Sequence, residues 1–298
     1  MRRRRLLTLL ALSPVLALAA CGDDGTATPA TEPPDGDSTP PAGDSTVPTT
    51  GSSGDYDHPT GADDVVVRIG YEGGFVTPEM SFAELPTLLV SGDGLAIQQG
   101  PQIMIYPGPF LPNLQQRTIS EDGIEQLLAL ADEHGLLQER TYERPDNIAD
   151  APDTVVTISA GGTTYEHRAY ALGLADPSGG PESDPARRQL QQFVDAAMAL
   201  TTGAESDVLG PEQPYAATVY LIRATAVDDT SGYDVEPTFV EWPADTGVAL
   251  ADAADCAEVP AAAVQALFEQ ANQLTFFTDE GIDYQLAVKA SLPGARTC

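Results

Sequence analysis

Short apolar runs bounded by glycine and proline recur along most of the chain after residue 62. They predict strands at residues 65–69, 85–90, 95–97, 103–106, 154–159, 163–170, 217–227, 238–242 and 284–288. The Ser-Gly-Asp-Gly sequence at 91–94 and the Ala-Gly-Gly sequence at 160–162 each join two such runs and are typical of hairpin turns. Because strands and helices do not alternate regularly, mainly antiparallel sheets are expected.

The spacing of apolar residues becomes helical in three places. Ile124, Leu127, Leu128 and Ala131 recur at helical intervals after Ser120, a residue type favoured at helix N-termini. Further helices are predicted over residues 184–203 and from residue 260. The expected fold is therefore α+β, with mainly antiparallel sheets and about three packed helices. Whether these form one layered domain or two similar subdomains stays open.

Composition divides the chain into four parts. Residues 1–20 have the pattern of a signal peptide. Residues 21–62 begin with Cys21 and continue as a Pro-, Thr-, Ser- and Asp-rich stretch without Leu, Ile, Phe or Trp, which predicts a disordered linker. A joint rich in Gly, Pro and Glu follows residue 203 and predicts a subdomain over 63–205 and a smaller one over 206–298.

The first residues indicate export. Four arginines at positions 2–5 precede an apolar stretch over 6–18, which is too short to span a bilayer as a stable helix. The sequence Leu18-Ala19-Ala20-Cys21 resembles the lipobox of bacterial prelipoproteins. That resemblance implies diacylation of Cys21 and cleavage before it, leaving the protein anchored to the cell membrane on its extracytoplasmic face. The alternative is an ordinary secretory signal with a chance cysteine.

Two cysteines remain after Cys21 is assigned to the lipid. In a chain bound for an oxidising compartment, Cys256 and Cys298 are expected to form a disulfide. The alternative is a pair of free thiols. The bridge would also fix the last residue of the chain.

The net charge limits the partners. It is −31, and it falls to −35 without the four arginines of the signal peptide. Such a charge repels nucleic acid and anionic lipid headgroups. Binding of nucleic acid is therefore excluded. An envelope protein or a small ligand remains possible as a partner. The negative charge also favours solubility.

Motifs for catalysis or cofactor binding are absent from the sequence. There is no Gly-x-Ser-x-Gly elbow, and the single lysine, Lys289, lies outside any phosphate-binding loop. His58 is expected at the disordered edge, His134 at a helix C-terminus and His167 in a strand, each with a structural role. No cofactor is predicted.

One loop offers a weak calcium hypothesis. Asp228, Asp229 and Asp234 gather around a glycine, but their spacing differs from that of an EF-hand loop. A solvated acidic turn between two strands explains the same residues, and the sequence favours it.

The body of the chain resembles uncharacterised lipoproteins of high-GC actinobacteria. The resemblance lies in the Val-Arg-Ile-Gly-Tyr-Glu-Gly-Gly-Phe sequence at 67–75 and the Ile-Tyr-Pro-Gly-Pro sequence at 105–109, with shorter matches at 85–86, 92–94, 136 and 171–173. It implies a location and no activity. The sequence therefore favours a membrane-tethered, non-catalytic binding module of the cell envelope. The alternatives are a hydrolase-like extracytoplasmic enzyme with a dispersed active site, or a weak calcium-binding module.

Aromatic residues near turns could anchor a partner. They are Tyr71, Phe75, Tyr106, Phe110 and Trp242. The sequence alone favours core or turn packing for most of them.

Overall fold

The structure is a computed structural model that describes residues 56–174, 184–203, 206–295 and 297–298. Within these ranges the chain has the predicted α+β fold, with two sheets and four α-helices. The predicted signal peptide, Cys21 and the linker up to residue 55 lie outside the described residues.

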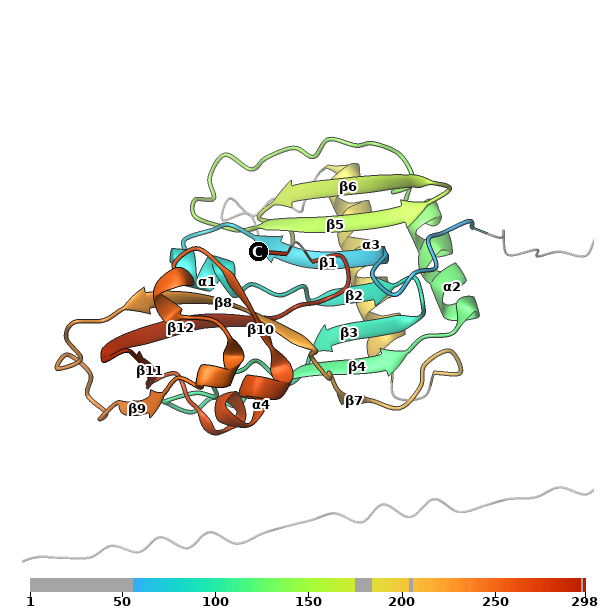
Figure 1. Cartoon of the computed structure of the whole chain (residues 1–298). Coiled ribbons are helices and arrows are strands. Elements are labelled where there is room, and N and C mark those ends of the chain that lie inside the picture. Colours follow the sequence, from blue (N-terminus) through green and yellow to red (C-terminus); the bar gives the residue numbers. More distant parts are fainter. Residues whose placement is uncertain (1–55, 175–183, 204–205, 296) are drawn as a thin grey trace, which may run out of the picture. The chain divides into compact units, whose positions relative to one another are not determined.

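The first sheet has seven strands in the order β6-β5-β1-β2-β3-β4-β7 (Figure 1). All neighbouring strands are antiparallel. Their bounds are β1 Val65–Glu72, β2 Leu88–Ser91, β3 Leu95–Gln99, β4 Leu114–Thr118, β5 Asp153–Ala160, β6 Thr163–Tyr170 and β7 Gln213–Pro214. The β2–β3 and β5–β6 pairs confirm both predicted hairpins.

Two helices, α2 (Glu121–Glu133) and α3 (Pro185–Thr202), cover one face of this sheet (Figure 1). The predicted caps are present: Ser120 Oγ accepts the Gly123 N–H, and an Asp184 carboxylate oxygen accepts the Ala186 N–H. The predicted apolar stripe of α2 is buried against the sheet. Both helices are therefore confirmed, together with the core that they form.

The second sheet has five strands in the order β10-β8-β12-β11-β9, and only the β11–β9 pair is parallel. The bounds are β8 Val219–Ala226, β9 Thr238–Glu241, β10 Ala257–Pro260, β11 Thr275–Asp279 and β12 Ile282–Ala290. Helix α4 (Ala261–Gln270) and the 3-10 turns η1 (Ala244–Thr246) and η2 (Leu250–Asp252) accompany it. The inner face of the sheet packs in an aromatic core with Phe268 of α4 and Trp242.

This second core draws side chains from both sides of the predicted boundary at 205/206. Leu89, Ile97 and Leu114 of the first sheet belong to it. Strand β7, which follows the boundary in sequence, pairs with β4 of the first sheet. The two sheets therefore share buried surface.

The predicted strand at 103–106 is wrong. The β3–β4 ladder ends where Gly100 N–H donates to the Asn113 carbonyl, and residues 101–113 leave the sheet as a loop. Prolines at 101, 107, 109 and 112 cannot donate to a ladder, so an apolar run between them does not pair. Strands β4, β7, β10 and β11 and the short helix α1 (Pro78–Phe82) were not predicted.

The N-terminal segment 56–62, assigned by sequence to the end of the linker, contacts α2. Tyr56 donates its N–H to Glu125 and its hydroxyl to Asp132, each at 3.1 Å. His58 is buried and contacts Glu121. The packed part of the chain thus begins by residue 56, before the predicted boundary.

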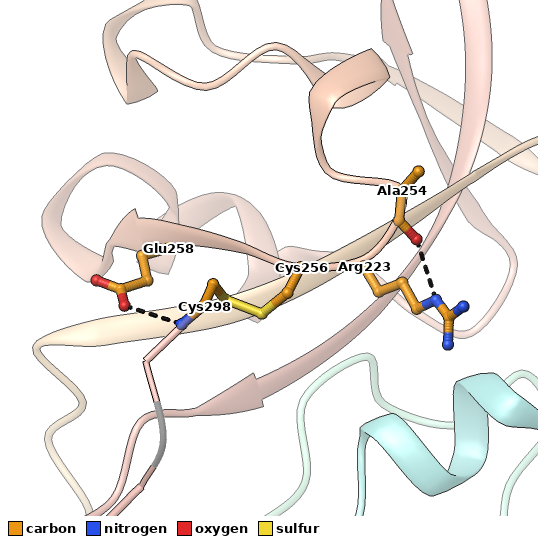
Figure 2. The surroundings of a disulfide bond; sticks show 5 residues. All are labelled: Arg223, Ala254, Cys256, Glu258 and Cys298. Atoms are coloured by element: carbon orange, nitrogen blue, oxygen red, sulfur yellow. Dashed lines mark hydrogen bonds between the residues drawn. A yellow bond between two sulfur atoms is a disulfide. The ribbon is translucent and has the colours of Figure 1, made fainter.

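A disulfide joins Cys256 and Cys298, as predicted (Figure 2). Cys256 directly precedes β10, and the Cys298 N–H donates to a carboxylate oxygen of Glu258 at 3.2 Å. Arg223 of the neighbouring β8 donates from Nε to the Ala254 carbonyl at 3.1 Å (Figure 2). The bridge therefore ties the last residue to the β10 edge of the second sheet.

Candidate binding groove

Large apolar side chains gather on the exposed surface around the loop of residues 101–113. Met104 is 96% exposed, and Ile103, Ile105 and Tyr106 are each more than half exposed. Met80 on α1 is 59% exposed. Single exposed apolar residues are ordinary, but a group of them marks a binding surface.

These side chains border a groove of about 1140 Å³. One wall is helix α1, with Met80 and the capping residues Thr77 and Ala83, and the other is the loop of residues 102–112. The floor is formed by β12 and the end of β8, where Gln285, Ala287 and Thr225 line it. Gln273 and Thr275 also line it, so the groove is built from five separate segments of the chain.

The alternation of β12 explains why its floor residues are available. Every second side chain of this strand is buried in the second core: Tyr284, Leu286, Val288 and Ala290. Gln285 and Ala287 consequently point to the opposite, outer face of the sheet. The residues that line the floor are therefore on the face that α4 does not cover.

Aromatic residues extend this outer face toward the β9 edge. The β11–β12 register, in which Phe277 lies opposite Tyr284, puts Phe276 beside Gln285. Phe276 is buried beneath two partly exposed rings, and the ring centroids of Phe239 on β9 and of Tyr233 in the β8–β9 loop each lie 5.7 Å from its own. The apolar surface therefore continues from the groove to the edge strand.

The loop that forms one wall is fixed at several points. Gln273 donates its backbone N–H to the Gly108 carbonyl at 3.0 Å, and its side-chain oxygen accepts the Gly108 N–H at 3.1 Å. The Phe110 ring packs against Phe268 and Phe277, with centroids 5.1 and 5.4 Å away. These contacts hold the loop base, so its exposed tip is presented from an anchored frame.

The opposite wall rests on β12. Thr77 is the N-cap of α1, and its hydroxyl accepts the Met80 N–H, while Pro78 is the first residue of the helix. Lys289 Nζ lies 4.8 Å from the centroid of the Phe82 ring, a cation–π contact between the helix and the strand. Helix α1 buries no residue of its own, so Met80 remains available to a partner.

Charge is distributed unevenly along the groove. At the α1 end, Arg223 is close to the carboxylate of Glu79, and Lys289 is close to the carboxylate of Glu84. The N–H of Glu79 itself and the Thr77 hydroxyl, with a smaller contribution from Arg223, lower the pKa of Glu79. The sequence has no Lys, Arg or His between positions 223 and 289, so the charged residues of β9, β11 and the β8–β9 loop are all acidic.

The calcium hypothesis has no support from the structure. Asp228, Asp229 and Asp234 lie in the loop between β8 and β9, where Asp229 accepts the Ser231 N–H at 2.8 Å. That hydrogen bond lowers the pKa of Asp229. Among the described residues, no group of three or more His, Cys, Asp or Glu side chains is arranged to hold a metal ion.

The histidines hold structural contacts. The Tyr142 hydroxyl donates to Nδ1 of the buried His167 at 2.7 Å, and Nε2 donates to the Leu136 carbonyl at 2.8 Å. Burial lowers the pKa of His167, which favours the neutral ring. His134 is the C-cap of α2.

The sequence predicted that His58 lies at the disordered edge of the linker, but the structure shows it buried. Its Nδ1 donates to the Pro59 carbonyl at 2.9 Å and its Nε2 to Glu121 at 2.8 Å. Burial opposes the charged ring, but the Pro59 carbonyl and the Glu121 carboxylate outweigh it and raise the pKa of His58. His58 therefore clamps the N-terminal segment to α2.

The aromatic candidates divide between surface and core. Phe75 is 90% exposed, and Tyr71 and Tyr106 are also exposed. Trp242 is buried and donates from Nε1 to the Val248 carbonyl at 2.8 Å. Phe110 packs against the second core, so the core packing that the sequence favoured holds for two of the five.

A second hollow, of about 660 Å³, lies between the N-terminal segment and strands β1, β5 and β6. Polar side chains, among them Asp63, Asp64 and Thr157, contribute to its lining. Two of its side chains are engaged elsewhere: His58 in the clamp and Arg68 with Glu72. Because it lacks exposed large apolar side chains, it is the weaker candidate for a binding site.

Comparison with protein families, with curated proteins and with solved structures finds no match to this chain. No helix among the described residues has both the length and the apolar character of a bilayer-spanning segment. The functional argument therefore rests on the groove and on the chemistry of its own residues.

Proposed function

We propose that this protein is a membrane-tethered, extracytoplasmic binding module without a catalytic role, and that the groove between α1 and the loop of residues 101–113 binds its partner. One observation carries the proposal: exposed apolar side chains from separate segments converge on a groove whose walls are anchored to the core. Burying apolar surface stabilises a complex, and anchored walls reduce the entropy lost on binding.

The N-terminal sequence supports the tether. An arginine-rich start, an apolar stretch and the Leu18-Ala19-Ala20-Cys21 sequence together match a lipoprotein signal. Two acyl chains on Cys21 give stable anchoring, which one chain alone does not. The Pro- and Thr-rich stretch after it separates the anchor from the folded domain.

The exposure of the walls favours a protein partner over a small ligand. A small-molecule site buries most of its ligand. Met104, with nearly all of its surface in solvent, cannot enclose one, whereas a partner surface would cover it. Methionine is flexible and polarizable, and it adapts to the shape of an apolar partner. Met80 and Met104 on opposite walls therefore suit a protein interface.

The test is site-specific photo-crosslinking in the cells that make the intact lipoprotein. A photoreactive residue replaces Met104 in one strain and Leu174, an exposed apolar residue outside the groove, in the other. We expect one reproducible protein adduct from position 104 and none from 174.

The captured protein is then purified and its affinity measured. Met80→Asp combined with Met104→Asp should weaken binding at least tenfold, because a carboxylate would be desolvated on each wall. Leu174→Asp is the matched control and should change nothing. Equal capture from both positions, or an unchanged affinity of the double variant, would overturn the proposed site.

The tether has its own test. Cys21→Ala should move the protein from the membrane fraction to the soluble fraction after cell lysis. Retention in the membrane at the wild-type level would show that the lipid on Cys21 is not the anchor.

A further inference from the structure

We infer that the groove binds a cationic amphipathic segment of a partner protein, with its apolar side chains against Met80 and Met104 and its basic side chains toward β9. This inference rests on the proposed function and names the chemistry of the partner. The groove defines the site, and the distribution of charge around it selects the occupant.

The acidic end lies beyond the lining residues of the groove and is defined by the six carboxylates of β9, β12 and the β8–β9 loop. They are Asp228, Asp229, Asp234, Glu236, Glu241 and Asp283. The strand register places two of them, Glu241 and Asp283, on the outer face. Both lie opposite Thr278, which is two residues beyond Phe276 in β11. Side chains two residues apart in a strand share a face. The carboxylates therefore border the aromatic extension of the groove.

The β8–β9 loop supplies the other four carboxylates. Its Tyr233 ring packs against Phe276, which holds the middle of the loop against the outer face. Asp234 directly follows Tyr233, and Asp228 lies two residues after Ala226, which lies opposite Tyr284 in the floor strand. A ligand that leaves the groove toward β9 thus meets a concentrated negative charge.

The opposite end does not share this charge. Arg223 and Lys289 are the basic residues on either side of the interval 224–288, which has none. Arg223 lies close enough to Glu79 to lower the pKa of that carboxyl. The charge at the α1 end is therefore nearly balanced, while the charge at the acidic end is not. This asymmetry gives the bound segment a direction, with its basic residues beyond Phe276.

The same charge argues against a membrane surface as the occupant. Exposed apolar side chains could insert into a bilayer, but anionic headgroups would lie against the acidic end and against a net charge of −31. Complementary charge instead steers a basic protein segment to the groove.

The test uses two dye-labelled peptides that differ only in charge. Both peptides begin with the same eight residues, in which Leu and Phe alternate. Four lysines follow in one peptide and four glutamines in the other. Fluorescence anisotropy measures their binding to the intact lipoprotein in phosphatidylcholine vesicles, with empty vesicles as the blank. We expect the lysine peptide to bind at least tenfold tighter at about 50 mM salt, and the difference to shrink at about 500 mM because salt screens exposed charges.

A charge variant locates the effect. Asp228→Asn, Asp229→Asn and Asp234→Asn together should weaken the lysine peptide at least fivefold and leave the glutamine peptide unchanged. The amide oxygen introduced at position 229 can still accept the Ser231 N–H, so the turn is retained. The matched control removes three exposed carboxylates far from the groove in sequence, with Asp122→Asn, Glu133→Gln and Glu139→Gln, and should have little effect.

The outcomes separate this inference from the proposed function. If both peptides bind equally and only Met80→Asp with Met104→Asp abolishes binding, the cationic partner is refuted and the groove remains the site. If both triple variants lose binding equally, or neither peptide binds, the inference is also overturned. Lipid as the photo-adduct at position 104 would refute the cationic partner and the protein interface together. A second copy of this acidic chain as the adduct would refute the cationic partner alone.

Discussion

Removing the disulfide should destabilise the protein through its unfolded state. Cys256 and Cys298 are 42 positions apart, with Cα atoms at 5.4 Å. For a closed loop of that length, the chain-entropy model gives a loss of about 4 kcal/mol in the free energy of unfolding when both cysteines become serine. For a folded domain of this size, that corresponds to a melting temperature lower by roughly 8–16 °C.

The native state should change little in this variant. Cys256 precedes β10 and Cys298 lies after the end of β12, so neither lies within a ladder. Strand β10 keeps its pairing with β8, and β12 keeps its pairing with β8 and β11. The loss of about 4 kcal/mol is therefore an upper value, assigned to the greater freedom of the unfolded chain.

Equilibrium unfolding in urea measures the effect, with and without reductant. We expect a lower midpoint for the double serine variant and a slightly larger dependence on urea, since its unfolded chain exposes more surface. Wild type with reductant should match the variant, and reductant should not affect the variant. A variant with the wild-type midpoint would refute the argument from loop closure.

Three further predictions concern single sites. His58 has a raised pKa, so the stability that it contributes is complete below about pH 6.5 and is lost as pH rises through the raised value. Denaturant unfolding of His58→Gln should show a smaller deficit at about pH 8.5 than at about pH 6, and a deficit independent of pH would contradict the clamp. Arg187 is buried and donates to the carbonyls of Glu143, Tyr170 and Ala171 at 3.0–3.2 Å. Arg187→Met should cost about 3–5 kcal/mol in calorimetry or urea unfolding, because three carbonyls lose their donor and an unsatisfied buried acceptor costs about 1–3 kcal/mol. A loss below about 1 kcal/mol would mean that these carbonyls find other partners.

The third prediction concerns the oxidation of the methionine side chains. Hydrogen peroxide transfers one oxygen atom to a methionine thioether, giving the sulfoxide and water. Peptide mass spectrometry should find Met104 oxidised fastest, then Met80, then Met198, which packs against the first core. Equal rates at all three would contradict the exposure of the groove walls.

The local part of the fold was readable from the sequence. Helix α2 was predicted from its cap at Ser120 to its end because its apolar stripe and its capping residue agree. The two hairpins were predicted for a similar reason, since their glycines occupy the positive φ that the turns require. In contrast, β4 has the sequence Leu-Gln-Gln-Arg-Thr, which carries no apolar alternation, and it forms because β3 supplies an unpaired edge.

The candidate groove was not predictable, and one signal was misread. The apolar run at 103–106 predicted a strand because a hydrophobic pattern does not distinguish a buried strand from an exposed loop. Its tip is exposed because Gly100 pairs with Asn113 and Gln273 holds Gly108, contacts that join residues far apart in sequence. The prolines that flank the run were the signal that could have corrected the prediction.

By itself the sequence determined the caps, turns and helical stripes, which depend on neighbouring residues, and the acidic charge. It also predicted the pairing of Cys256 with Cys298. Tertiary structure decided what depends on long-range packing. The β11–β12 register put Phe276 beside Gln285, and the loop anchors turned an apolar run outward to face Met80 on α1. The reason is physical: local preferences act over a few residues, whereas the outer face of a sheet exists only after strands distant in sequence have paired.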